Sequence, residues 1–243
     1  MFKLVGINSL VTGGSRGIGL EISKELAKLG SNVCIVSRNG EINEKAVKEL
    51  PIVCEGQKHF GMVYDLSQGI HELEPTIQKL KEMHSVKAFN IYVHSAGIIQ
   101  SKLLLQTTSS DIQSIMNTNT ISAMSISKSL LKDMVKERYG RIVLVSSVLA
   151  ATGFPGESVY SASKSALIGF SKSLAQEMNR YNITCNLISP GYVDTDMIKH
   201  LKNSKLSNIS KAEDVAKSIL PLLDRDSAYN GKTVKIQGDS IVY

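Results

Sequence analysis

Near its start the chain passes from a short apolar run into a glycine-rich turn and then into a helical pattern. The turn reads Thr-Gly-Gly-Ser-Arg-Gly-Ile-Gly over residues 12–19, and apolar residues at helical spacing follow as far as Gly30. A strand, a glycine-rich turn and a helix, in that order, are the context in which a dinucleotide pyrophosphate binds at a helix N-terminus. Gly13 and Gly17 would let the backbone approach the phosphates, and Gly19 would let the helix pack closely. The sequence therefore predicts a dinucleotide-binding α/β fold.

Apolar runs alternate with amphipathic stretches along the rest of the chain. This alternation predicts a parallel sheet with helices on both faces, which is a Rossmann-type doubly wound fold. A length of 243 residues with 42% hydrophobic content suits a single domain over residues 1–243. The expected strands are residues 6–12, 32–37, 60–64, 89–95, 141–147, 183–188 and 233–236.

Five residues that follow these strands are expected to converge at one edge of the sheet. Ligands of such folds bind beyond the carboxyl ends of the strands, so residues just after each strand meet there. The chain places Gly13, Asp65, Gly97, Ser147 and Pro190 at these points.

Tyr160 and Lys164 stand four residues apart, in the run Ser-Val-Tyr-Ser-Ala-Ser-Lys over residues 158–164. Positions i and i+4 share one face of a helix, so the Lys164 ammonium could lie near the Tyr160 phenol. A nearby cation is expected to lower the pKa of the phenol toward the range useful in proton transfer. The pair alone would also fit an ordinary amphipathic helix with a surface Tyr and Lys, so further motifs must decide.

Several motifs in the right order resemble the short-chain dehydrogenase/reductase family, from Val5 nearly to the C-terminus. Residues 12–19 resemble its cofactor turn, and Asp65 matches the acid that meets the adenine. Residues 94–97, His-Ser-Ala-Gly, stand where the family has Asn-Asn-Ala-Gly, and residues 189–195 resemble the segment that closes over the nicotinamide.

The resemblance implies a catalytic tetrad in which Tyr160 protonates a substrate carbonyl oxygen while hydride reaches the carbon. Ser147, thirteen residues before Tyr160, would hydrogen-bond that oxygen; its rival is the adjacent Ser146. Lys164 would bind the nicotinamide ribose, and Asn119, whose rival is Asn117, would bend a helix and link Lys164 through water to solvent. The implied cofactor-binding residues are Gly13, Ser15, Arg16, Gly17, Ile18, Gly19, Arg38, Asp65, Ala96, Gly97, Tyr160, Lys164, Pro190, Gly191, Val193 and Thr195.

The residues after the second strand favour NADP(H) over NAD(H). An NAD enzyme would carry an acid there against the ribose 2′-hydroxyl, but this chain has Ser37, Arg38 and Asn39. Arg38 could pair with a 2′-phosphate, and Arg16 could add a second contact.

Residues 138–197 resemble most closely the 3-oxoacyl-[acyl-carrier-protein] reductases of fatty acid biosynthesis, and also related mitochondrial carbonyl reductases that act on quinones and acyl thioesters. In the former, basic residues beside the cleft receive an acidic acyl carrier protein. Arg138 matches one such position, and Arg180 adjoins the other, which is Tyr181. The resemblance also implies a homotetramer, in which the small residues Ala162, Ala166 and Gly169 could pack. A silent NADP(H)-binding subunit or sensor is the rival, and the intact tetrad argues against it.

Two departures from the family pattern concern the surroundings of the chemistry. His94 and Ser95 replace an Asn-Asn pair, which would alter hydrogen bonds of the central sheet. The segment of residues 196–214 is shorter than the usual substrate lid and lacks its Pro-x-x-Arg element, which leaves substrate size and lid closure open.

Composition excludes several other classes. The net charge of +6 and pI near 9.1 would suit nucleic acid, but the charge is diffuse and aromatics are only 5%. The densest basic stretch, Lys199, His200, Lys202 and Lys205, is expected to be a solvated face. Three cysteines and scattered histidines predict no disulfide framework and no metal. No apolar run reaches membrane-spanning length and the first predicted strand begins almost at Met1, so we expect a cytoplasmic or mitochondrial matrix protein without a cleavable presequence.

Overall fold

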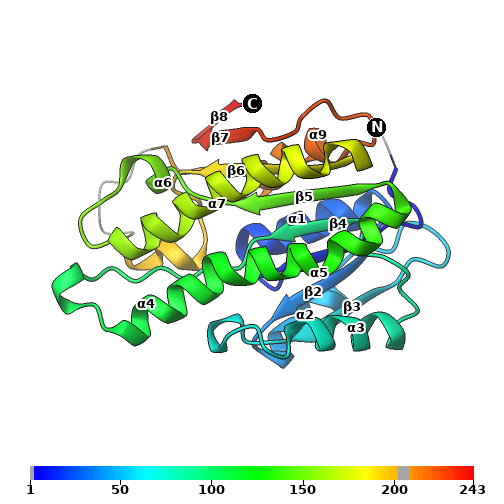
Figure 1. Cartoon of the computed structure of the whole chain (residues 1–243), viewed down its shortest axis with the longest axis horizontal. Helices are drawn as coiled ribbons and strands as arrows, with labels where there is room; N and C mark the ends of the chain where they lie inside the picture. The colour runs from blue at the N-terminus through cyan, green and yellow to red at the C-terminus, as the bar shows by residue number, and fades with distance from the viewer. Residues whose placement is uncertain (1–2, 202–207) are drawn as a thin grey trace.

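The computed structural model describes residues 3–201 and 208–243, with the side chains of residues 199–201 also left aside (Figure 1). Within these ranges the strands form one sheet in the order β3-β2-β1-β4-β5-β6-β7-β8. Neighbouring strands are parallel except for the last pair, β7 and β8. The strands are β1 (Asn8–Thr12), β2 (Asn32–Ser37), β3 (His59–Val63), β4 (Ile91–His94), β5 (Gly140–Val145), β6 (Ile183–Pro190), β7 (Thr233–Gln237) and β8 (Ser240–Val242).

Helices connect the parallel strands, as the alternating pattern predicts. The α-helices are α1 (Gly17–Lys28), α2 (Gly40–Lys48), α3 (Leu73–Met83), α4 (Ser109–Met116), α5 (Ser122–Glu137), α6 (Leu149–Thr152), α7 (Ser158–Met178), α8 (Ala212–Ser218) and α9 (Leu220–Leu223). Short 3-10 turns are η1 (Leu66–Gln68), η2 (Leu104–Gln106), η4 (Asn179–Tyr181) and η5 (Asp196–Leu201), and η3 (Asn117–Ile121) is a π-helical turn between α4 and α5.

Adjacent residues of each central strand enter two different hydrophobic cores, one on each face of the sheet. In β1, Val11 packs with Ile22 of α1 and Val215 of α8. Its neighbour Leu10 faces the opposite core, with Ile126 of α5 and others from α3 and α7. Figure 1 shows α5 and α7 running in front of the strands. Because both faces are covered, the strands are continuously apolar rather than alternating, and the predicted Rossmann-type fold is confirmed.

The strand order reverses between β1 and β4, which creates the crevice where doubly wound folds bind ligands. The predicted strands match within one or two residues at most ends, and β2 has the predicted bounds. The sequence analysis missed β8, a short antiparallel edge strand whose three residues are all exposed. Such a strand carries no buried apolar pattern from which to predict it.

Candidate functional site

A cleft of about 840 Å³ opens at the carboxyl ends of the parallel strands. All five residues expected to converge there line it, which confirms that inference from strand order. They are Gly13, Asp65, Gly97, Ser147 and Pro190. The cleft is large enough for an extended dinucleotide and a small acyl or carbonyl substrate.

The glycine turn forms one end of this cleft, and its glycines have distinct roles. Gly13 and Gly17 have positive φ values of 65° and 55°, which side-chain-bearing residues rarely adopt. A Cβ atom at Gly13 would lie 2.8 Å from the Ala96 Cα atom, and one at Gly19 would lie 2.3 Å from the Gly13 carbonyl oxygen. Gly19 therefore packs the helix onto the turn and does not line the cleft. This bare backbone fits a pyrophosphate at the start of α1.

The remaining predicted cofactor residues border the same cleft. A Cβ atom at Gly17 would lie 3.1 Å from the Thr195 Cγ2 atom, so residues 190–195 close over the glycine turn. Apart from Gly19, every predicted cofactor-binding residue lines the cleft: Gly13, Ser15, Arg16, Gly17, Ile18, Arg38, Asp65, Ala96, Gly97, Tyr160, Lys164, Pro190, Gly191, Val193 and Thr195.

The side chains of Tyr160 and Ser147 lie together at the part of the cleft away from the glycine turn. Ser147 follows β5 and Tyr160 lies in the first turn of α7, and both are buried, at 8% and 7% exposure. A hydrogen bond joins their side chains. The rival Ser146 instead donates its hydroxyl to the Lys164 carbonyl oxygen at 3.0 Å, which ties α7 to the end of β5. The geometry therefore favours Ser147 for contact with a substrate.

Lys164 lies deeper, and its effect on Tyr160 differs from the sequence expectation. Its Nζ atom donates to the Val145 carbonyl oxygen at 2.8 Å and lies 6.0 Å from the Tyr160 ring centroid. Burial raises the pKa of Tyr160, and the hydrogen bond from Ser147 offsets this only in part. Burial also lowers the pKa of Lys164 to about 8. The expected lowering of the phenol pKa is thus wrong for this structure, because removal from water is the largest influence on the phenol.

Asn119 lies in the π-helical turn η3 and braces the chain beside the cleft. Its Oδ1 atom accepts from the Ile98 backbone nitrogen at 2.8 Å, while its Nδ2 atom donates to the Ile98 carbonyl oxygen at 3.0 Å and to Ser163 Oγ at 2.9 Å. A Cβ atom at Gly97 would approach both Lys164 Nζ and Asn119 Oδ1, at 3.3 and 3.6 Å. Asn119 is fully buried and acts by holding backbone near Lys164.

The rival Asn117 faces elsewhere in the same turn. Its side chain donates to the Ser67 carbonyl oxygen at 3.0 Å, away from Lys164. A π-helical turn at this point also agrees with the helix bend expected from the resemblance, since such turns often occur at functional sites.

Glu157 is a residue near the chemistry that the sequence analysis missed. It precedes α7 by one residue and is 6% exposed, and its Oε1 atom accepts from Ser101 Oγ at 2.6 Å. Its negative charge adds to the burial that raises the pKa of Tyr160. A carboxylate three residues before the tyrosine was the available signal, because such a spacing brings two side chains close at the start of a helix.

The residues after β2 line the end of the cleft near the glycine turn. Ser37, Arg38 and Asn39 border it, and so does Arg16. Arg16 and Arg38 are exposed. Asp65 Oδ1 accepts from the backbone and hydroxyl of Ser67, and these bonds, with the charge of Arg38, hold its pKa below the usual value despite burial.

The lid segment is described only in part. Asp196, Met197 and Ile198 of η5 line the cleft, and a bridge between Val193 and Ser210 anchors the base of the segment. Of the basic stretch, Lys202 and Lys205 lie outside the described residues, and the side chains of Lys199 and His200 are not described.

Arg138 and Arg180 lie together, but at the opposite edge of the sheet from the cleft. Arg138 ends α5 just before β5, and its Nη2 atom donates to the Arg180 carbonyl oxygen at 3.1 Å. The Arg180 guanidinium lies 4.8 Å from the Tyr181 ring centroid. In this chain alone the two arginines therefore lie away from the cleft, because both precede the amino ends of their strands.

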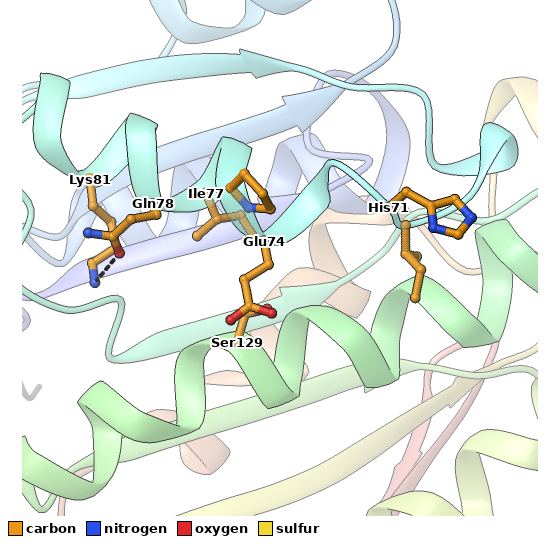
Figure 2. Close-up of a pocket in the computed structure, with 8 residues that line it drawn as sticks. His71, Glu74, Ile77, Gln78, Lys81 and Ser129 are labelled. Carbon is orange, nitrogen blue, oxygen red and sulfur yellow. Dashed lines mark hydrogen bonds between the residues drawn. The ribbon is translucent and has the colours of Figure 1, made fainter.

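A second groove, of about 430 Å³, lies between α3 and α5 (Figure 2). Lys81 donates there to Gln78 at 3.5 Å and forms an ion pair with Asp133 at 2.5 Å. The groove shares no lining residue with the cleft. Across the described part of the chain, no three metal-binding side chains cluster, and no helix has the length and apolarity needed to cross a membrane.

Comparison with known proteins gives a consistent result. The short chain dehydrogenase family matches residues 8–206. The 3-oxoacyl-[acyl-carrier-protein] reductase FabG of Chlamydia trachomatis is 34% identical over 245 residues, covering 97% of each chain. Carbonyl reductase family member 4 of Xenopus laevis is 37% identical over 220 residues, covering 88% of this chain and 89% of the relative. A solved short chain dehydrogenase/reductase family protein superposes with a TM-score of 0.85 at 27% identity, covering 98% of both chains.

Proposed function

This chain belongs to the short-chain dehydrogenase family of oxidoreductases, and we propose that it reduces a 3-oxoacyl thioester to the 3-hydroxyacyl form with NADPH, in fatty acid biosynthesis. The observation that carries the proposal is the meeting of the Ser147 and Tyr160 hydroxyls above the buried Lys164 at one side of the cleft. This arrangement suits donation of a proton to a carbonyl oxygen.

The chain's own residues supply the acid and the oxygen site. A nicotinamide bound in the cleft would supply the hydride for the carbonyl carbon. Tyr160, kept protonated by burial, donates its hydroxyl proton to the carbonyl oxygen, so the C=O bond becomes CH–OH. Ser147 donates a hydrogen bond to the same oxygen as negative charge develops on it. Lys164 would bind the nicotinamide ribose, and Asn119 would hold the adjoining backbone in register and link Lys164 through water to solvent.

NADP(H) is the proposed cofactor because the end of the cleft carries cations and no acid after β2. Ser37 and Asn39 flank Arg38 where an acid would meet the 2′-hydroxyl of NAD(H). A guanidinium can instead pair with the 2′-phosphate through two parallel hydrogen bonds, and Arg16 would add charge from the glycine turn.

Two kinds of relative support two substrate classes. The FabG relative is named as a 3-oxoacyl-[acyl-carrier-protein] reductase, and the match covers 97% of its length, which supports a thioester substrate. A relative named as a carbonyl reductase supports the alternative, reduction of small carbonyl compounds or quinones. A silent NADP(H)-binding subunit would have little need of all four tetrad residues.

We also propose that an acidic acyl carrier protein binds near Arg138 and Arg180 and that the protein is a homotetramer. Because the arginine pair lies away from the cleft of its own chain, it could lie beside a cleft only if that cleft belongs to a second copy of this chain. Carrier binding at this pair therefore requires the oligomer. Ala162 and Gly169 are exposed on α7 and leave room for a close helix contact. A cytoplasmic or mitochondrial matrix location would provide the NADPH.

The test follows loss of reduced-nicotinamide absorbance with acetoacetyl-carrier, acetoacetyl-coenzyme A and a quinone, each with NADPH and NADH. Turnover fastest with the carrier thioester and NADPH supports the proposal. A quinone preference would assign the chain to the alternative. Equal rates with carrier and coenzyme A thioesters, unchanged in Arg138→Glu, would contradict carrier binding at the arginine pair.

A further inference from the structure

The segment that follows β4 passes along the cleft without forming a helix or a strand. Within it, residues 98–102, which we call the strap, lead from Gly97 towards α4, and Ile98 and Ile99 line the cleft. Asn119 holds the first residue of the strap through both its backbone nitrogen and its carbonyl oxygen. The other end of the strap has an attachment of its own, to which the proposed chemistry gives no role.

Two hydrogen bonds attach this far end to the residues just before α7. Ser101 Oγ donates to Glu157 Oε1 at 2.6 Å, and the Lys102 backbone nitrogen donates to the Gly156 carbonyl oxygen at 3.1 Å. Gly156 has a φ of 85°, a value that side-chain-bearing residues rarely adopt. A side-chain bond and a backbone bond therefore join the two segments at neighbouring residues.

Together with Asn119, these bonds form a closed circuit around Tyr160. Asn119 Nδ2 donates to Ser163 Oγ at 2.9 Å, and Ser163 Oγ donates to the Tyr160 carbonyl oxygen at 2.7 Å. The circuit runs from α7 through Asn119 to one end of the strap, and from the other end through Glu157 back to the start of α7. Tyr160 lies between the two attachment points, three residues after Glu157 and three before Ser163. Because the strap and Tyr160 line the same cleft, a displaced strap would change the space beside the Tyr160 side chain.

The Glu157 carboxylate is directed at the strap rather than at its own helix. It is the N-cap residue of α7, yet its side chain makes no capping hydrogen bond there. An acid at a helix N-terminus would ordinarily stabilise that end of the helix. Glu157 is 6% exposed, and its second oxygen, Oε2, is buried without a hydrogen-bond partner among the described residues. Since a buried charge with so few partners costs stability, a role at the strap explains this carboxylate better than stability does.

We propose that Glu157 and Ser101 are positioning residues: their hydrogen bond fixes the strap against the start of α7 and so sets the space in which a carbonyl substrate meets Tyr160. This role rests on the proposed function in so far as Tyr160 is the proton donor there. The bond involves no residue of the glycine turn and none of the residues after β2. It should therefore affect the reaction more than cofactor binding.

The first experiment measures backbone hydrogen exchange in the full chain and needs neither substrate nor turnover. We expect Ser101→Ala and Glu157→Ala each to raise the exchange rate of the Lys102 amide by about tenfold or more, because both remove the charged hydrogen bond beside it. Ser171→Ala is the matched control, since it removes a hydroxyl hydrogen bond elsewhere on α7 and should leave Lys102 unchanged. Wild-type exchange at Lys102 in both variants would overturn the proposal, whether or not the chain proves to be an active reductase.

The second experiment is a double-mutant cycle in kcat, which separates positioning from stability. We expect Ser101→Ala and Glu157→Ala each to lower kcat with the acetoacetyl thioester by about tenfold, with the dissociation constant of NADPH unchanged. The double variant should lose little more than either single variant, because both changes remove the same hydrogen bond. Losses that multiply in the double variant, or wild-type kcat in both single variants, would overturn the positioning role.

Glu157→Gln covers the case in which Glu157→Ala does not fold, and it separates the hydrogen bond from the charge. The amide oxygen can accept from Ser101 as the carboxylate does. We therefore expect slow exchange at Lys102 and a kcat within about threefold of the wild type. A loss of kcat as large as that in Ser101→Ala, with exchange at Lys102 still slow, would show that the charge rather than the attachment acts on Tyr160 and would contradict the proposal.

Discussion

The two sides of the cleft hold their functional groups in opposite ways. On the side formed by η3, the end of β5 and α7, which we call the catalytic wall, Tyr160 and Lys164 are 7% and 3% exposed and bonded to protein atoms. On the side formed by the glycine turn and the residues after β2, the cofactor wall, Arg16 and Arg38 are exposed. Proton transfer needs fixed geometry, whereas a phosphate can be bound by mobile cations. Changes to the first wall should therefore lower kcat, and changes to the second should alter cofactor choice.

The largest effect of the three variants that probe this contrast is expected from Asn119→Ala on the catalytic wall. The variant leaves the Ile98 backbone without its partners and frees the chain beside Lys164. We expect kcat to fall by about 100-fold, the scale of a 1 Å misplacement, with little change in the dissociation constant of NADPH. Asn117→Ala is the matched control, because it alters the same turn but bonds Ser67. Equal losses in the two variants would contradict the assignment of Asn119.

A smaller effect, on selectivity rather than rate, is expected from Arg38→Glu on the cofactor wall. Loss of a charged hydrogen bond to the 2′-phosphate costs about 1.5–3 kcal/mol, so the NADPH over NADH preference in kcat/KM should fall by about 10-fold to 100-fold. Arg138→Glu changes the net charge equally at the far edge of the sheet and should leave the ratio unchanged. An unaltered ratio in Arg38→Glu would place cofactor choice elsewhere.

The smallest effect is expected from pH, through the buried cation of the catalytic wall. Burial lowers the pKa of Lys164 to about 8, so the ammonium is present below that pH and lost above it. The pKa of Tyr160 is raised, so the phenol stays protonated through this range. Reductive kcat/KM should therefore decline above pH 8 by several-fold.

The Lys164→Arg variant identifies the group responsible for this decline. A guanidinium stays charged throughout this range, so the decline should disappear in the variant even if its overall rate is lower. A decline at the same pH in Lys164→Arg would show that another group titrates.

Much of the fold was predictable because its signals are local. The apolar runs predicted the parallel strands, because burial of neighbouring residues determines them. The glycine turn predicted the order of strand, turn and helix, because it depends on backbone conformation at neighbouring residues. The short strand β8 was missed because every residue in it is exposed.

The site was predictable as a set of residues but not in its electrostatics. Convergence at the cleft follows from strand order alone. The raised pKa of Tyr160 does not, because it depends on how deeply α7 packs and on Glu157, which sequence spacing does not weigh. The position of Arg138 and Arg180 at the opposite edge follows from their place before β5 and β6 and could have been inferred from the expected topology.

The most direct test of the central claim compares Tyr160→Phe with the wild type for NADPH binding and for turnover of an acetoacetyl thioester. The proton-donor assignment predicts a loss in kcat of about 100-fold to 10,000-fold, the range for a general acid, with NADPH binding retained. Wild-type turnover in the variant would contradict it. Tight NADPH binding by the wild type without turnover of thioester or quinone would favour a silent cofactor-binding subunit instead.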